Sequence, residues 1–268
     1  MTASRIARVS LISVFALIFS ACGTLPSGGT WGDSATIRPG WARVGQAARA
    51  AATDPWVWAP LATAALLQVD DFDRRTSDWA REHTPIFGSQ SNAEKWSDDL
   101  RSTAGVVSLV TLVATPGGDD AGQWLISKAK GGAVEVAAIG VTSAATVALK
   151  SATGRERPNG ADDESFPSGH TSSAAVHGQL AKINLESIPM SAGLRLTADI
   201  GIDAVTVGTA WARVEAGWHY PSDTLVGMAL GTFVASFATR TFLPETAQDA
   251  LALAATDGGA MLEWNVRF

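Results

Sequence analysis

The stretch FPSGHTSSA, residues 166–174, is the part of the sequence from which the fold can be worked out. Pro167 ends a loop, and the residues that follow Ser168 have the composition of a helix. The first turn of a helix has backbone N–H groups without intrahelical acceptors, and the helix dipole adds partial positive charge there. Such an end suits an anion like phosphate, and His170 adds a titratable group beside it. The stretch therefore predicts an anion site at a helix N-terminus.

Two further stretches supply charge on either side of this one. They are KSATGRERP, residues 150–158, and ARVEAGWHYPSD, residues 212–223. Their charged or titratable residues of interest are Lys150, Arg157, Arg213, His219 and Asp223. Phosphoryl transfer depends mainly on positioning and on neutralisation of charge, and arginine's planar fork can bind two oxygens at once. No histidine and carboxylate cluster has metal-ligand spacing. The sequence therefore predicts a phosphate site that uses cations in place of a metal, with no cofactor.

Composition limits the possible classes of protein. The chain has 268 residues, of which 46% are hydrophobic and 17% charged, and its mean hydropathy is +0.13. This suits one large domain with a sizeable core. The net charge of −6 and the lack of a basic run argue against nucleic-acid binding. The only cysteine is Cys22, which excludes an intramolecular disulfide and a cysteine-based zinc site.

The N-terminus predicts export. Residues 1–21 have two arginines followed by a short apolar run and small residues, as in a signal peptide. With Cys22 directly after them, the pattern resembles a bacterial lipoprotein signal, which implies a lipidated Cys22 that attaches the protein to a membrane. Gly23 in place of aspartate implies the outer membrane of the bacterial envelope, facing the periplasm. An ordinary secretory signal or an uncleaved anchor remains the alternative.

The body of the chain is predicted to be all-α. Residues 22–45 are rich in small and polar residues and are expected to form the lipidated N-terminus and a flexible tether. Residues 46–245 are expected to form one helical bundle of about six to eight helices, with the active site at helix ends. Helical patterns cover residues 57–69, 71–83, 92–115, 119–150, 168 onward, 191–213 and 221–242.

Three local expectations accompany this assignment. Asp119 or Asp120 is expected to cap the helix that follows it, and Gly131-Gly132 is a possible weak point inside that helix. No run reaches the roughly 20 uncharged apolar residues that span a bilayer, so the body is expected to be water-soluble. The C-terminal tail, residues 246–268, ends in MLEWNVRF, which fits either a short strand or a docking segment.

Taken in order, the three motifs resemble the type 2 phosphatidic acid phosphatase superfamily, which includes lipid phosphate phosphatases, bacterial class A acid phosphatases and vanadium haloperoxidases. Lys150 precedes Arg157-Pro158 by six intervening residues, PSGH occupies residues 167–170, and Arg213 is followed by His219 and then Asp223. The resemblance covers residues 150–223. Ala212 stands where the third motif often has serine.

The resemblance implies a role for each motif residue. His219 would attack phosphorus to give a phosphohistidine, and Asp223 would hydrogen-bond the far ring nitrogen of His219. His170 would protonate the leaving oxygen and then take a proton from the attacking water. The residues implied to hold the phosphate oxygens are Lys150, Arg157, Ser168, Gly169 and Arg213.

The leading hypothesis is an envelope phosphatase that hydrolyses a phosphomonoester or pyrophosphate of a lipid, since a membrane tether would hold it near such substrates. A broad-specificity acid phosphatase acting on small soluble phosphate esters is the first alternative. A vanadium haloperoxidase and a non-catalytic envelope lipoprotein are the others. Glu215, which lies between Arg213 and His219, is expected to be solvated or ion-paired. The motifs contact only the phosphate, so they do not identify the leaving group.

Overall fold

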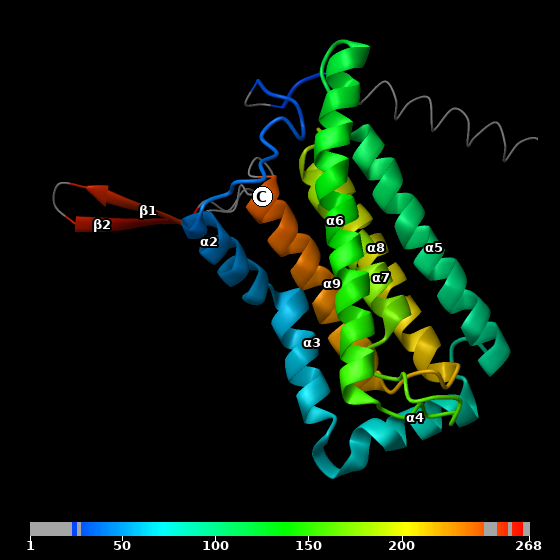
Figure 1. Cartoon of the computed structure of the whole chain (residues 1–268). Coiled ribbons are helices and arrows are strands. Elements are labelled where there is room, and N and C mark those ends of the chain that lie inside the picture. Colours follow the sequence, from blue (N-terminus) through cyan, green and yellow to red (C-terminus); the bar gives the residue numbers. More distant parts are fainter. Residues whose placement is uncertain (1–22, 26–27, 244–250, 257–258, 265–268) are drawn as a thin grey trace, which may run out of the picture.

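The computed structural model describes residues 23–25 and 28–243, together with the backbone of residues 251–256 and 259–264. In these residues the chain forms a helical bundle and one C-terminal hairpin (Figure 1). The assignment to the all-α class is confirmed. The helices are α2 (Trp41–Ala52), α3 (Pro55–Leu66), the 3-10 turn η1 (Val69–Asp71), α4 (Phe72–His83), α5 (Gln90–Ala114), α6 (Ala121–Thr153), α7 (Gly169–Glu186), α8 (Ala192–Glu215) and α9 (Pro221–Phe242).

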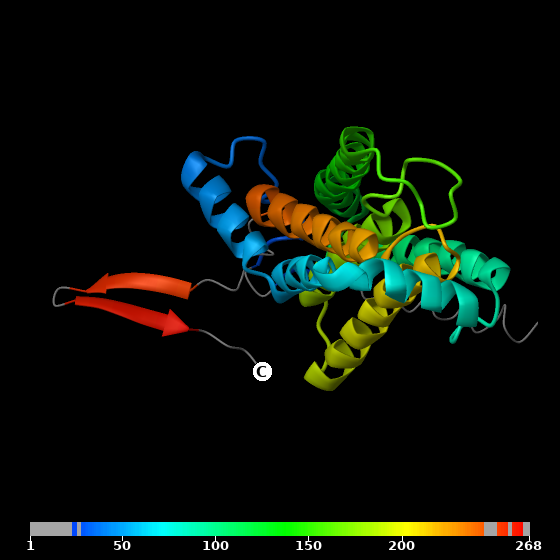
Figure 2. The ribbon, with the colours of Figure 1, turned by 90° about the horizontal axis from the view of Figure 1, so that it is seen from below.

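Helix α7 lies at the centre of the bundle. It packs against α5, α6, α8 and α9, and most of its residues are buried. In Figure 1 the long helices run alongside one another, whereas α4 lies across their lower ends, and Figure 2 shows the molecule from that lower side. One end of the bundle is therefore covered by α4 and by the loops that join the long helices.

The closest packing in the bundle is between α7 and α9, and two glycines permit it. A Cβ on Gly227 would lie 2.6 Å from the carbonyl oxygen of Ser168, and one on Gly231 would lie 2.3 Å from that of Ser172. Neither distance leaves room for a side chain, because both neighbours are backbone atoms. These glycines bring the start of α7 against the first turns of α9, which fixes the second motif next to the third.

Side-chain caps start the long helices where the sequence predicts. The Asp120 carboxylate accepts hydrogen bonds from the N–H groups of Gly122 and Gln123, which confirms the expected cap of α6. The same helix passes through Gly131-Gly132 without a break. The ring of Trp31 lies on Gly131, where a Cβ would come within 2.1 Å of it. The expected weak point is thus a docking position for an aromatic side chain.

Part of the expected tether is packed onto the bundle. Trp31 is only 1% exposed, and the N–H of Thr36 donates to the carbonyl of Phe242 at 3.1 Å. Helix α2 begins at Trp41, earlier than the expected domain start at residue 46. The flexible-tether expectation is therefore wrong for the segment that includes Trp31, because a large aromatic side chain gains more from burial than the chain loses in entropy. Cys22 and the predicted signal at residues 1–21 lie outside the described residues.

The tail contains more strand than its sequence indicates. Strand β1 (Leu251–Thr256) pairs antiparallel with β2 (Gly259–Trp264), with Leu251 opposite Trp264. The sequence left open whether MLEWNVRF is a strand or a docking segment, and the backbone of residues 261–264 belongs to β2. The partner strand has the sequence LALAAT, whose alanines and leucines gave no alternating pattern to predict it.

The outer surface of the bundle is unusually apolar. Although no run of about 20 uncharged apolar residues was expected, α6 and α9 are long and apolar enough to cross a membrane by length and composition alone, among the described residues. Helix α9 is mostly buried inside the bundle, whereas only 22% of the most apolar window of α6 is buried. The large exposed hydrophobic side chains on α6 are those of Leu125, Ile126, Val136, Val141, Val147 and Leu149.

Candidate active site

The three motifs meet at the end of the bundle that α4 covers. The N–H of Ser168 donates to the carbonyl of Asp223 at 3.0 Å, which joins the second motif to the third. Arg157 Nη1 donates to the carbonyl of Trp218 at 3.4 Å, which joins the first motif to the third. These two hydrogen bonds join the three motifs, so residues up to 73 positions apart in the chain form one site.

His219 is buried and its tautomer is fixed by the backbone. It is 2% exposed, and its Nδ1 lies 2.6 Å from the carbonyl oxygen of Ser165. A carbonyl only accepts, so Nδ1 carries the proton and Nε2 carries the lone pair. Burial lowers the pKa of His219 well below its usual value, and the nearby charges of Arg213, Lys150 and Arg157 lower it further. His219 is therefore a neutral imidazole with one free nitrogen, as a nucleophile requires.

Asp223 does not hydrogen-bond His219 directly, which corrects the expectation drawn from the motif. Its Oδ2 lies 3.9 Å from His219 Nδ1. The link between them is Ser165, whose hydroxyl donates to Asp223 Oδ2 at 2.6 Å while its carbonyl accepts from His219. Asp223 Oδ2 also accepts the N–H of Tyr220 at 2.9 Å, so the carboxylate is held in the first turn of α9.

His170 has a partner that the motifs did not indicate. Its Nε2 lies 2.7 Å from Oδ1 of Asp98 on α5. Burial lowers the pKa of His170 to about 4, the positive charges of Arg213 and Arg101 lower it as well, and Asp98 raises it. The same hydrogen bond holds the pKa of Asp98 below its usual range. Asp98 is 72 residues upstream of His170, and no local spacing relates the two.

The three predicted cations lie near His219, and the charge of each lowers its pKa. Arg213 is 5% exposed, and its Nε has no hydrogen-bond partner among the described residues, although Nη1 approaches Ser97 Oγ at 3.4 Å. Burial lowers the pKa of Arg213 to about 10, so the guanidinium remains charged at neutral pH. A buried charged N–H without a partner is costly, and an anion would satisfy it.

The other two cations have protein partners. Arg157 Nε donates to Asp162 Oδ1 at 2.5 Å, and Lys150 Nζ donates to the carbonyl of Glu164. The guanidinium groups of Arg157 and Arg213 lie 4.9 and 5.1 Å from the centre of the Trp218 ring. The indole of Trp218 thus holds the two arginines in place from its faces.

Ser168 and Gly169 start α7, as the sequence predicts. The Ser168 side chain is fully buried and accepts hydrogen bonds from the N–H and the hydroxyl of Thr171, at 3.4 and 3.1 Å. Its oxygen therefore caps the helix. Gly169 is the first residue of α7, where its N–H is not needed by the helix.

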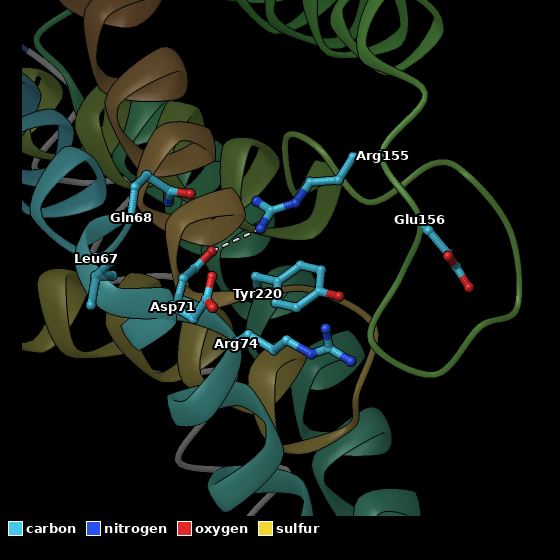
Figure 3. A pocket seen from close by; sticks show the side chains of 8 residues that line it. Leu67, Gln68, Asp71, Arg74, Arg155, Glu156 and Tyr220 are labelled. Carbon is cyan, nitrogen blue, oxygen red and sulfur yellow. Dashed lines mark hydrogen bonds and ion pairs between the residues drawn. The ribbon is translucent and has the colours of Figure 1, made fainter.

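Two site residues, Arg155 and Asp73, were missed by the sequence analysis. Arg155 Nη1 donates to Asp223 Oδ1 at 2.6 Å, and Nη2 donates to Asp73 Oδ2 at 2.9 Å. Arg155 lies inside the first motif, but the motif's spacing does not mark it, and Asp73 lies on α4. Figure 3 shows Arg155 reaching toward α4 across a cavity of about 280 Å³ that is also lined by Asp71, Arg74, Glu156 and Tyr220.

Glu215 has a structural place beside the third motif. It is fully buried and accepts hydrogen bonds from the N–H groups of Ile86 and Phe87, both at 3.0 Å, and from Trp211 Nε1 at 2.6 Å. The expectation of a solvated or ion-paired glutamate is therefore wrong. The carboxylate instead fixes the loop between α4 and α5 onto α8, which supports the covered end of the bundle.

The family comparison agrees with the motifs. Residues 133–246 match the sequence model of the PAP2 superfamily, the type 2 phosphatidic acid phosphatase superfamily. This segment contains all three motifs and helices α7, α8 and α9. The segment that carries the three motifs is therefore similar to this superfamily, which supports a phosphatase. No curated protein gave a significant sequence match.

The fold also has a match among solved structures. It is similar to a crystal structure described as the first transmembrane PAP2 type phosphatidylglycerolphosphate phosphatase, from Bacillus subtilis, with a TM-score of 0.50 and 19% identity. The match covers 69% of this chain and 92% of the other. At this identity the likeness concerns the fold alone, which is the helical bundle.

Proposed function

We propose that the protein hydrolyses a phosphomonoester or pyrophosphate of a lipid at a membrane surface, through a phosphohistidine on His219 and without a metal ion. The observation that carries this proposal is the buried pairing of a neutral His219 with the partly unsatisfied guanidinium of Arg213. A nucleophile that carries a free lone pair lies near a buried guanidinium whose Nε has no partner among the described residues. That combination suits a phosphoryl group, whose charge must be neutralised as it is transferred.

The chemistry proceeds in two steps. In the first, His219 Nε2 forms a bond to phosphorus while the bond from phosphorus to the leaving oxygen breaks, and protonated His170 gives its proton to that oxygen. In the second, His170 takes a proton from water, the water oxygen attacks phosphorus, and the N–P bond breaks to release inorganic phosphate. Throughout, the Nδ1–H of His219 stays on the Ser165 carbonyl, and Lys150, Arg157 and Arg213 neutralise the phosphate oxygens.

A lipid substrate is supported by the exposed apolar surface. Helix α6 exposes large aliphatic side chains along much of its length, and α3 adds Trp58, Leu61 and Leu66, which are 52%, 43% and 69% exposed. Both helices pack against α9, and exposed apolar side chains in such numbers are typical of a surface that contacts a membrane. We place this surface against the hydrocarbon of a membrane, with the catalytic end outside it at the polar interface. The Bacillus subtilis phosphatase of similar fold is described as transmembrane.

A second candidate function is the hydrolysis of soluble phosphate esters. The cavity in Figure 3 favours it, because that cavity lies at the catalytic end and its lining is polar, with Asp71, Arg74 and Glu156 among its residues. A polar leaving group would fit such a cavity better than an acyl chain would. A comparison of substrates separates the two candidates.

The test is phosphate release by the purified full chain in EDTA and mild detergent. The substrates are phosphatidic acid, phosphatidylglycerophosphate, a polyprenyl diphosphate and p-nitrophenyl phosphate. We expect lipid substrates to be preferred, and the His219→Ala variant to lose activity by more than about a thousandfold. The matched control is His83→Ala, an exposed histidine at the end of α4, which should retain full activity.

Two further results bear on the same proposal. A phosphorylated protein band that is stable to base and labile to acid should be trapped in wild type and absent from His219→Ala. Undiminished hydrolysis by His219→Ala would refute the mechanism. Preference for p-nitrophenyl phosphate over all lipid substrates would establish the second candidate in place of the first.

A further inference from the structure

Arg155 is placed between two buried carboxylates. Its Nη1 lies 2.6 Å from Asp223 Oδ1 and its Nη2 lies 2.9 Å from Asp73 Oδ2. The side chains of Asp73 and Asp223 are 4% and 0% exposed, and that of Arg155 is 30% exposed. Two carboxylates this deeply buried and this close together would repel each other, and the single guanidinium between them compensates both.

Asp73 and Arg155 also fix the first turn of α9. Asp73 accepts the N–H of Ser222 at 2.8 Å and the Ser222 hydroxyl at 2.5 Å, and Arg155 Nη1 donates to that hydroxyl at 2.9 Å. The guanidinium lies 4.1 Å from the centre of the Tyr220 ring. Tyr220 follows His219 and Ser222 precedes Asp223 in the chain, so α4 and the first motif together hold the third motif.

A short chain of hydrogen bonds connects Arg155 to the nucleophile. Asp223, held through Oδ1 by Arg155, accepts the Ser165 hydroxyl through Oδ2, and the Ser165 carbonyl accepts from His219 Nδ1. Arg155 itself has no contact with His219. Its effect on the imidazole passes through Asp223 and Ser165, so it acts by orienting the ring and by fixing the tautomer.

We propose that Arg155 and Asp73 are positioning residues for His219: together they hold Asp223 and Ser165 in the geometry that keeps the His219 imidazole in its reactive orientation. The inference rests on the proposed nucleophilic role of His219 and adds residues that the three motifs do not mark. Arginine suits this place because its planar fork reaches two carboxylates at once and stacks on Tyr220, whereas lysine has a single charged nitrogen.

The experiment compares kcat and KM in Arg155→Ala, Arg155→Lys and Asp73→Asn. Arg155 is bound to Asp73 and Asp223 and is not one of the cations proposed to hold the phosphate, so its loss should leave KM within about threefold. The loss should lower kcat by about a hundredfold, as expected when a reactive group is displaced by about 1 Å. The kcat of Arg155→Lys should be about tenfold higher than that of Arg155→Ala, since a positive charge near Asp223 is kept. Asp73→Asn should lower kcat less than Arg155→Ala does, and phosphohistidine trapping should fall in proportion to kcat.

Two controls make the result specific. Arg75→Ala removes an exposed arginine of α4 that pairs only with Asp70 and Phe72 among the described residues, and it should leave kcat and KM unchanged. Arg157→Ala removes a cation that is proposed to hold the phosphate. It should therefore raise KM, in contrast to Arg155→Ala, which should lower kcat. If thermal unfolding shows that Arg155→Ala does not fold, Arg155→Lys and Asp73→Asn serve as the test instead. A lower kcat with little change in KM in both variants would then support the positioning role.

The inference would be overturned by folded Arg155→Ala protein with wild-type kcat, or by a loss confined to KM. It would also be overturned if Arg155→Lys were as inactive as Arg155→Ala although equally stable. These results differ from a failure of the proposed function, which would appear as full activity in His219→Ala. An inactive His219→Ala beside a fully active Arg155→Ala would reject only the positioning role.

Discussion

The two histidines of the site have different kinds of hydrogen-bond partner. His219 donates to a backbone carbonyl, which fixes its tautomer without adding charge, whereas His170 is paired with the carboxylate of Asp98. A carboxylate favours the protonated imidazole and a carbonyl does so much less. Asp98 therefore favours a proton on His170 and opposes the effect of burial, which still lowers the pKa of His170 to about 4, whereas nothing comparable in the described part of the chain favours a proton on the second nitrogen of His219.

The partner of His170 gives a pH prediction. Asp98 raises the pKa of His170, which burial and Arg213 lower to about 4. Activity that requires protonated His170 declines as pH rises through this pKa. In Asp98→Asn the raising influence is lost, the pKa falls further, and we expect the alkaline decline of kcat/KM to move to lower pH. The measurement is kcat/KM against pH, corrected for ionisation of the substrate.

The control for this prediction is Asp99→Asn. Asp99 is the next residue on α5, is exposed, and makes no side-chain contact with His170. Its variant should reproduce the wild-type profile. An unshifted profile in Asp98→Asn, with the protein still folded, would show that Asp98 does not set the proton affinity of His170.

At the scale of elements, the N-terminal segment and α6 depend on each other. Trp31 packs on Gly131, its carbonyl accepts the hydroxyl of Ser127, and Lys128 Nζ lies 5.2 Å from its ring centre. Gly131 is therefore a close-contact position, and it does not weaken the helix. The segment before α2 closes the end of the bundle opposite the catalytic site.

We expect Trp31→Ala to destabilise the protein by about 3–5 kcal/mol, the usual cost of removing a buried tryptophan side chain. Thermal unfolding in detergent measures it. Trp41→Ala is the matched control, because Trp41 is 89% exposed and should give little change. Equal stability of the two variants would mean that the segment around Trp31 behaves as a tether after all.

At the scale of the whole molecule, the two ends of the bundle have different tasks. Gly23 pairs with Gly118 just before α6 begins, and the proposed active site lies where α6 ends. A helix of 33 residues is about 50 Å long. If a lipid on Cys22 were the attachment and the bundle stood upright on the membrane, the proposed site would lie about 50 Å from the membrane surface. Access to lipid phosphates in a membrane is easier to explain if the apolar surface of α6 itself contacts the bilayer.

This placement predicts that Cys22→Ser protein still sediments with membranes and needs detergent for extraction. Charged residues introduced into the apolar surface, as in Val136→Glu with Val141→Lys, should weaken that association, since each charge costs about 2.5–3.5 kcal/mol in the centre of a bilayer. The assay is extraction by carbonate and by detergent. Release of Cys22→Ser into the aqueous fraction without detergent would show that a lipid anchor alone holds the protein.

The sequence by itself determined the helices and the three motifs. These are local properties, which can be recognised in a single sequence: helical periodicity, caps such as Asp120, and the order of Lys150, His170 and His219. Only the tertiary structure decided the partners: Asp98 for His170, Ser165 for His219, and Arg155 with Asp73 for Asp223. The residues of the Arg155–Asp73 pair are 82 positions apart, and no local rule relates them. Which helix faces meet depends on packing across the whole bundle, as at Gly227 and Gly231, and that packing assembles the site.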